Sequence, residues 1–251
     1  MGNQMIFKRY EIKYMLTDKQ KIELLNVMQD RMAADIHGRN TILSLYLDTP
    51  DYLLIRRSIE KPVYKEKLRL RSYGVASKDS EVFIELKKKY DSVVYKRRVG
   101  MSEAELEHYL STGVSGRDSQ IMREIDYSIG RYAGIAPRML ISYEREAFYD
   151  RSDYDFRMTF DENILWCDDD LSLCSPVRGQ RLLPPSQVLL EVKTSGAIPL
   201  WLVHFLSENK IRPASFSKYG SAYTTMLSSR NDTDTRPDIT DIQNGGIYQY
   251  A

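Results

Sequence analysis

Hydrophobic and polar positions alternate in eight short segments of the chain. In residues 67–71, Lys67, Arg69 and Arg71 alternate with Leu68 and Leu70. Because successive side chains of a β-strand point to opposite faces, the three cations share one face and the two leucines share the other. The same pattern occurs in residues 9–14, 44–49, 67–72, 82–88, 93–99, 140–147, 156–161 and 188–193. Turn-like polar residues separate these segments, which together predict a largely antiparallel sheet or barrel.

Helix signals fall between the predicted strands. Ser102 and Glu105 form a capping box, and Pro199 suits the first turn of a helix. The predicted helices span residues 17–32, 102–110, 118–132, 199–209 and 219–227. Strands and helices intermix without a clear linker, so we expect one α+β domain over residues 1–227. Residues 228–251 are rich in Asp, Asn, Thr and Gly and predict a flexible polar tail.

Charged residues share one face of nearly every predicted strand. For a single strand, the simplest explanation is that these charges face water. Seven strands with two or three charges each are harder to explain in that way. The apolar stripes of the helices need an apolar sheet face to pack on, so we expect the helices to cover the leucine face. The charged face then becomes the inner face of a closed or nearly closed barrel.

Cations outnumber acids on this predicted inner face. The cations are Lys13, Lys67, Arg69, Arg71, Lys87, Lys96, Arg98, Arg145, Arg157 and Lys193. The acids are Glu11, Glu85, Asp161 and Glu191. Unpaired buried ions cost several kcal/mol each, so an interior of this kind must be hydrated and must await a polyanion. Arg and Lys hold phosphate oxygens, and a few carboxylates among them suit a Mg²⁺ or Mn²⁺ ion that bridges to phosphates.

Composition restricts the other functional classes. The formal net charge of +1 provides no bulk attraction to nucleic acid or to a membrane. No apolar run approaches transmembrane length and no signal-peptide pattern opens the chain, so we expect a cytoplasmic protein. Cys167 and Cys174 match no common zinc or redox motif. The chain also lacks a G-x-x-x-x-G-K-[ST] loop, so any nucleotide must be held by side chains.

An ordered set of motifs resembles one known group of enzymes. The E-x-K pairs at residues 11–13, 85–87 and 191–193, with LYLDT at 45–49 and KLRLR at 67–71, resemble triphosphate tunnel metalloenzymes. Within that group the chain is most similar to the VTC domain, a polyphosphate polymerase module. The stretches that carry this closer likeness are RYEIKY at 9–14, GAIPLWLVHFLSE at 196–208 and SFSKYGSAY at 215–223. The resemblance runs from about Met5 to Leu227.

The resemblance implies an antiparallel β-barrel, or triphosphate tunnel, with a charged lumen and helices outside. It implies transfer of the ATP γ-phosphate onto a polyphosphate chain with a divalent ion, usually Mn²⁺. By position, the catalytic residues would be Lys67, Arg69, Arg71, Arg145, Arg157 and Lys193. Further phosphate-binding residues would be Lys13, Lys87, Lys96, Arg98 and Lys218. Glu191 is the first choice of metal ligand, followed by Glu11 and Glu85.

Two other functions stay open. The same site would hydrolyse inorganic or nucleoside triphosphates if water replaced the acceptor chain, or it could bind polyphosphate without turnover. The first strand has a single E-x-K, with Arg9 two residues before Glu11, where the wider tunnel family often has E-x-E-x-K. Fewer carboxylates favour one metal ion over two and weaken the case for efficient hydrolysis. If the product enters a compartment, a separate membrane protein must receive it.

Overall fold

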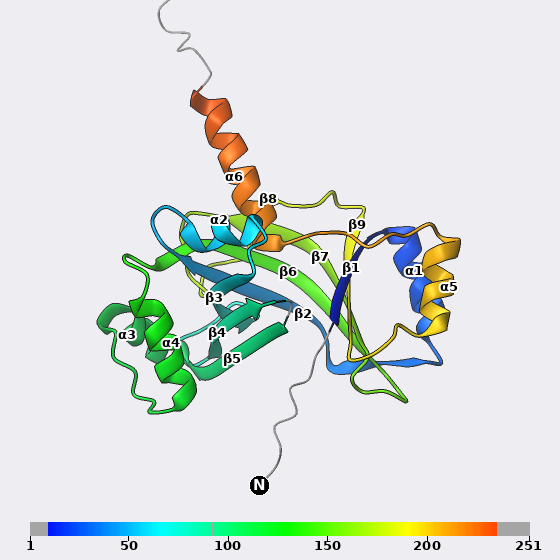
Figure 1. Cartoon of the computed structure of the whole chain (residues 1–251), viewed down its shortest axis with the longest axis horizontal. Helices are drawn as coiled ribbons and strands as arrows, with labels where there is room; N and C mark the ends of the chain where they lie inside the picture. The colour runs from blue at the N-terminus through cyan, green and yellow to red at the C-terminus, as the bar shows by residue number, and fades with distance from the viewer. Residues whose placement is uncertain (1–9, 92, 235–251) are drawn as a thin grey trace, which may run out of the picture.

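The structure, a computed structural model of the 251-residue chain, describes residues 10–91 and 93–234. Within these ranges one antiparallel sheet contains all the strands (Figure 1). The strands are β1 (Tyr10–Thr17), β2 (Met32–Asp48), β3 (Tyr64–Tyr73), β4 (Glu81–Tyr90), β5 (Val93–Ser102), β6 (Ala136–Asp150), β7 (Arg157–Cys167), β8 (Gln180–Arg181) and β9 (Gln187–Thr194). The helices are α1 (Asp18–Met28), α2 (Leu53–Ile59), α3 (Glu103–Thr112), α4 (Gln120–Gly130), α5 (Leu200–Glu208) and α6 (Lys218–Asp234). Each predicted strand segment has its counterpart in the sheet, which confirms the antiparallel architecture.

The sheet curves strongly but stays open. Its strand order is β1-β9-β7-β6-β2-β3-β4-β5, with β8 paired to β7. No backbone pairing joins β1 to β5 in the described ranges, so the structure shows a tunnel-like open sheet in place of a closed barrel. The two ends nevertheless approach each other, because Lys87 Nζ of β4 lies 3.7 Å from a Glu11 carboxylate oxygen of β1. That contact is only geometrically feasible if the sheet curls around its charged face.

Four helices cover the outer face of the sheet, as the alternation predicts. Helices α3 and α4 pack on one end of the sheet, where Leu68 and Leu70 of β3 are buried beneath them. Helices α1 and α5 pack on the other end, over Tyr14 of β1 and Val192 of β9 (Figure 1). The leucines of the KLRLR segment therefore face the core, and its cations face the inner side of the sheet.

Helices α2 and α6 lie on the inner side, which the sequence analysis did not predict. Ile55 of α2 and Tyr219 of α6 pack with Tyr46 and Ile141 in a third apolar cluster, which fills one end of the inner face. The tyrosine rings of Tyr46 and Tyr219 stack with centroids 4.3 Å apart. This end of the tunnel is therefore occupied by side chains, and the predicted cations lie beyond it.

Helix α6 also extends further than predicted. It continues to Asp234, so residues 228–234 are helical and do not belong to a tail. The hydroxyls of Thr224, Ser228 and Ser229 each donate to the carbonyl four residues earlier, so these polar side chains find partners within the helix. Figure 1 shows α6 projecting away from the sheet. The remaining predicted tail, residues 235–251, lies outside the described residues.

A buried aspartate fixes both inner helices to the sheet. The Asp48 carboxylate accepts hydrogen bonds from the backbone N–H groups of Leu54 and Ile55 at 2.9 and 3.0 Å. It also accepts a hydrogen bond of 2.9 Å from the Tyr219 hydroxyl. Asp48 is fully buried, so its replacement leaves these donors without partners in a dry environment.

We therefore expect Asp48→Ala to lower the free energy of unfolding by about 3 kcal/mol or more. Urea unfolding followed by circular dichroism would measure the change. Asp79→Ala is the matched control, because Asp79 is exposed and removal of its carboxylate leaves no buried donor unpaired. Equal stability of the two variants would contradict the anchoring role of Asp48.

None of the helices in residues 10–91 and 93–234 has both the length and the apolar character needed to span a membrane. Both cysteines are free thiols, in agreement with the absence of a disulfide motif.

Candidate functional site

Strand register gathers the predicted cations on the inner face. Arg69 of β3 lies opposite Glu85 of β4, and Lys67 lies opposite Lys87. Lys13 of β1 lies opposite Glu191 of β9. The remaining predicted residues on the inner face are Glu11, Arg71, Lys96, Arg98, Arg145, Arg157, Asp161 and Lys193. Lys218, at the first position of α6, reaches the same face from the helix side.

Glu85 is the centre of the first ion-pair cluster. Arg69 contacts one Glu85 oxygen through Nε at 2.7 Å and through Nη2 at 2.6 Å. Lys96 and Arg98 contact the other oxygen at 2.8 and 3.5 Å, and Arg71 approaches at 3.9 Å. Burial would raise the pKa of Glu85, but Arg69, Arg71 and Lys96 outweigh it and hold that pKa well below its usual value. These contacts give Glu85 a role in orienting the surrounding cations, and its role as a metal ligand stays a prediction.

Glu191 and Asp161 form the second cluster. Arg145 donates to both oxygens of Asp161 at 2.6 Å each and to Glu191 at 2.8 Å. Lys218 also contacts both acids, with Asp161 the closer partner and Glu191 at 3.2 Å. Burial would raise the pKa of Glu191, but Lys218, Arg145 and Lys13 hold it well below its usual value. Asp161, which received no role from the sequence, thus orients Arg145 and Lys218.

Three consecutive residues before and at the start of α6 bridge the two sides of the tunnel. The carbonyl of Phe216 accepts a hydrogen bond of 3.0 Å from Lys13 of β1. The hydroxyl of Ser217 accepts one of 3.0 Å from Lys67 of β3. Lys218 then reaches the acids of β7 and β9. The segment 216–218 therefore links β1, β3, β7 and β9 from the inner side of the open sheet.

Lysines face one another across β3, β4 and β5. Lys65 lies opposite Lys89, Lys67 opposite Lys87, and Lys87 opposite Lys96. We call these five residues the lysine ladder. Like charges directly opposite each other destabilise a sheet. Burial and the neighbouring lysines lower the pKa of Lys65, and burial is also the largest effect that lowers the pKa of Lys96.

Three members of the ladder have no acidic partner. Within the described part of the chain, no carboxylate lies within 4.0 Å of the ammonium groups of Lys65, Lys67 or Lys89. Opposed lysines without acidic partners lower the stability of the fold. Proteins typically accept a loss of stability of this kind at functional sites. The ladder therefore indicates a bound polyanion as the missing partner.

Two predicted cations lie toward the other end of the inner face. Arg157 is exposed at the start of β7 and donates to the Tyr154 carbonyl at 3.2 Å. Its register partner Lys193 is enclosed, and burial lowers the pKa of the Lys193 ammonium. Thr159, which lies opposite Glu191, has a buried hydroxyl without a hydrogen-bond partner among residues 10–91 and 93–234. This end thus carries donors that are available to a ligand.

Tyr46 is a site residue that the sequence analysis missed. Its hydroxyl lies 3.4 Å from Nη1 of Arg69. Burial would raise the pKa of Tyr46, but Arg69, Lys67 and Arg71 outweigh burial and lower it to about 8. The LYLDT segment placed Tyr46 on a strand, and its register opposite Arg69 puts it on the inner face. The alternation of charged side chains does not mark a neutral tyrosine, so the sequence pattern carries no signal for Tyr46.

Glu11 and Glu191 fit a divalent ion best. They lie on neighbouring strands, and each has an oxygen within 4 Å of Lys13 Nζ, at 3.6 Å for Glu11 and 3.3 Å for Glu191. Despite burial, Lys87 and other cations keep the pKa of Glu11 below its usual value, so both carboxylates are ionised at neutral pH. In residues 10–91 and 93–234 no cluster of three or more His, Cys, Asp or Glu residues could hold a metal. The donors present thus suit an ion that shares its coordination with phosphate oxygens and water.

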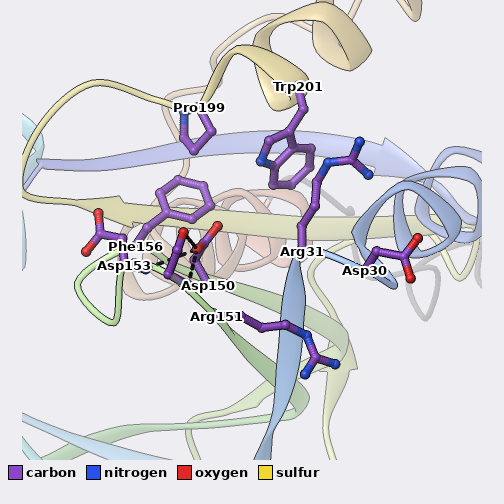
Figure 2. Close-up of a pocket in the computed structure, with 9 residues that line it drawn as sticks. Asp30, Arg31, Asp150, Arg151, Asp153, Phe156, Pro199 and Trp201 are labelled. Carbon is purple, nitrogen blue, oxygen red and sulfur yellow. Dashed lines mark hydrogen bonds between the residues drawn. The ribbon is translucent and has the colours of Figure 1, made fainter.

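A pocket on the outside of the protein is lined by none of the catalytic, phosphate-binding or metal-ligand residues predicted from the sequence. Figure 2 shows it at the β6–β7 turn, where Phe156, Trp201 and Arg31 line it. Asp150 accepts hydrogen bonds from the backbone and hydroxyl of Ser152 at 2.8 and 2.6 Å, so its carboxylate fixes this turn. The pocket lacks the cation surplus of the inner face.

Comparisons with known proteins agree with this geometry. A family model described as the VTC domain matches residues 8–227. A candidate adenylate cyclase from Bacillus halodurans aligns with a TM-score of 0.52 and 12% identity, covering 84% of this chain and 95% of that one. A candidate adenylate cyclase from Vibrio parahaemolyticus gives a TM-score of 0.45 and 13% identity over 89% of this chain and 99% of that one, too weak a similarity to support a common fold. No curated protein matches the sequence. At 12% identity the Bacillus structure indicates a shared fold and nothing about the reaction.

Proposed function

Because this chain belongs to the VTC domain family, we propose that it transfers the γ-phosphate of ATP to the end of a polyphosphate chain. The observation that carries the proposal is the lysine ladder, three of whose five members have no carboxylate within 4.0 Å among the described residues. A linear polyanion of repeating phosphates provides evenly spaced charges along such a ladder. The proposal places the reaction in the cytoplasm and assigns any transfer of the product across a membrane to a separate membrane protein.

The mechanism depends on positioning and on neutralisation of charge. Phosphoryl transfer requires an in-line nucleophile and cations around the equatorial oxygens. Arg69 and Arg145 are held in place by carboxylates, so their guanidinium groups are oriented before the substrate binds. Lys67 and Lys193 have ammonium donors that no carboxylate occupies at ion-pair distance in the described ranges. The terminal phosphate of an acceptor chain is already anionic, so chain growth needs no strong general base.

A divalent ion would be held by Glu191 and Glu11 together with the substrate. Mn²⁺ or Mg²⁺ would supply additional neutralisation of the phosphate oxygens. Two carboxylates without a third make a weak site on their own. We therefore expect Mn²⁺ alone to bind no more tightly than about millimolar, and to bind far more tightly when tripolyphosphate is present.

Electron paramagnetic resonance of Mn²⁺ titrated into the protein, with and without tripolyphosphate, would measure this difference. Glu208→Gln, a change of an exposed carboxylate on α5, is the control and should leave both titrations unchanged. Micromolar Mn²⁺ binding in the absence of phosphate would contradict the shared site.

Binding of tripolyphosphate should weaken as the pH rises through 8. Burial is the main cause that lowers the pKa of Lys67, to about 8, so above this pH the side chain loses its positive charge. Tyr46, with a pKa of about 8, gains a negative charge in the same range. Both changes reduce the attraction for phosphate, and we expect the affinity to fall about tenfold between pH 7 and pH 9.

Isothermal titration calorimetry at several pH values would test this expectation. Lys67→Arg combined with Tyr46→Phe keeps the cation charged and removes the phenol, so its pH dependence should be flatter. The ligand titrates equally in both experiments and cancels in the comparison. Identical pH profiles for the two proteins would contradict the assignment.

The decisive test of the proposed function is incubation of the pure protein with ATP and Mn²⁺. We expect products that run as a polyphosphate ladder on a stained gel. Orthophosphate without polymer would identify a triphosphate hydrolase instead. Tight, salt-sensitive binding of polyphosphate with no release of phosphate over hours would identify a binding module.

A further inference from the structure

Ser217 lies next to a lysine in a geometry suited to proton transfer. Its hydroxyl oxygen is 3.0 Å from Nζ of Lys67. The same oxygen accepts a hydrogen bond of 3.2 Å from the backbone N–H of Gly220, in the first turn of α6. The hydroxyl proton itself has no acceptor among the described residues. Ser217 is half-buried and lies between Lys67 on β3 and the Phe216 carbonyl that binds Lys13.

Lys67 has the properties of a base. Burial is the largest effect that lowers the pKa of the Lys67 amine, and Lys87, Lys13 and Lys65 lower it further against the opposing effect of Tyr46. No carboxylate in the described ranges comes within ion-pair distance to hold it charged. Lys67 Nζ donates to the Ser217 hydroxyl across 3.0 Å, and once the amine is neutral the same contact lets it accept the hydroxyl proton.

We propose that Ser217 is a phosphate acceptor, and that the protein phosphorylates itself there with Lys67 as the base. The inference rests on the proposed function, since ATP must bind in the same tunnel. The Ser217 oxygen forms a bond to the γ-phosphorus, and the bond from that phosphorus to the β–γ bridging oxygen breaks. ADP leaves with the electron pair, and the serine proton passes to the Lys67 amine. No oxidant or further reactant is required.

The surroundings stabilise the product as well as the reaction. The phosphoserine would lie at the N-terminus of a 17-residue helix, where free backbone N–H groups and the helix dipole favour negative charge. Lys67, protonated by the reaction, would then pair with the phosphate. Lys13, whose ammonium binds the adjacent Phe216 carbonyl, adds a second nearby cation.

The alternative is that Ser217 only caps α6. Two substitutions separate these roles. Ser217→Asn keeps a good helix cap but removes the hydroxyl nucleophile. Lys67→Arg keeps a positive charge but removes the base, because arginine does not deprotonate in proteins. Ser215→Ala is the matched control, since Ser215 is exposed two residues earlier in the same segment.

The experiment incubates each full-length protein with ATP and Mn²⁺ and then measures its intact mass and the phosphorylated peptides. Polyphosphate and orthophosphate are measured in the same samples. We expect one phosphoryl group at Ser217 in the wild type and in Ser215→Ala, none at this position in Ser217→Asn, and about 100-fold slower labelling in Lys67→Arg. Unchanged thermal unfolding of Ser217→Asn would show that α6 is intact.

Two results would overturn the inference. In the first, the wild type converts ATP to polyphosphate or orthophosphate while Ser217 stays unmodified, which leaves the proposed function standing. In the second, Lys67→Arg is labelled as fast as the wild type, which removes Lys67 from the reaction. Failure of the proposed function looks different, because then neither polymer nor phosphate nor labelled protein forms.

Discussion

Arg69→Ala is expected to reduce phosphoryl transfer about 1,000-fold or more. Arg69 is the cation that Glu85 orients most closely, through contacts of 2.7 and 2.6 Å, and its guanidinium lies on the inner face between Lys67 and Arg71. A positioned arginine that neutralises charge on a transferred phosphoryl group typically contributes 10³-fold or more, and water in its place supplies no charge. Steady-state production of polyphosphate from ATP would measure the loss.

The same substitution should also destabilise the fold, and a second change separates the two effects. Removing Arg69 leaves Glu85, which is 1% exposed, with weaker compensation, at a cost of about 3 kcal/mol. Adding Glu85→Gln removes the stranded charge, so the double variant should regain stability without regaining activity. Arg212→Ala, a change of an exposed arginine, is the control. Retention of more than a tenth of the activity in Arg69→Ala, or recovery of activity in the double variant, would contradict a direct role.

Glu191→Gln is expected to reduce metal-dependent transfer about 100-fold or more. Glu191 is the carboxylate that fits a divalent ion best, and its side chain also contacts Lys13, Arg145 and Lys218 at 3.3, 2.8 and 3.2 Å. A glutamine preserves the shape but removes the charge that both the ion and the three cations require. A Mn²⁺ titration of the reaction rate would show a raised metal requirement together with a lower maximum.

Metal-free binding of tripolyphosphate distinguishes this effect from general damage. Removing a negative charge from the inner face should leave that binding unchanged or make it tighter. Glu208→Gln again serves as the control, with wild-type values for both quantities. Weaker phosphate binding in Glu191→Gln would indicate that the carboxylate mainly orders the cations around it.

Period-two alternation made the strands and the inner cations predictable. Leu68 and Leu70 had to be covered, and this placed Lys67, Arg69 and Arg71 on the opposite face without knowledge of the fold. The capping box of Ser102 and Glu105 located α3 for an equally local reason, because both hydrogen bonds form within one turn.

Local sequence patterns could not predict which acids and cations form ion pairs. Arg145 contacts Asp161 and Glu191, and this choice depends on how β6, β7 and β9 align across long stretches of sequence. The enclosure of Glu85 by four cations depends on register in the same way. A carboxylate whose sequence context predicts a metal ligand can thus form ion pairs with several cations in the folded protein.

Helix α2 was not predicted from the sequence, for a different reason. It has seven residues, and Tyr52 precedes it with a left-handed backbone and no side-chain cap, so no sequence signal marks its start. Helix α6 was predicted too short because its polar residues suggested a loop, while their hydroxyls bond to the helix backbone.

Pairing of β1 with β9 limits how much of the sheet can fold during translation. The partner of the first strand, β9, is synthesised near the end of the domain, and Lys218 is synthesised after it. Until β9 and Lys218 have been synthesised, Glu11 and Lys13 lack the paired strand and the partners that complete the site. A shorter nascent chain therefore cannot form a working site. Contacts between such distant parts of a sequence also slow folding, and we expect this domain to mature over milliseconds to seconds or longer.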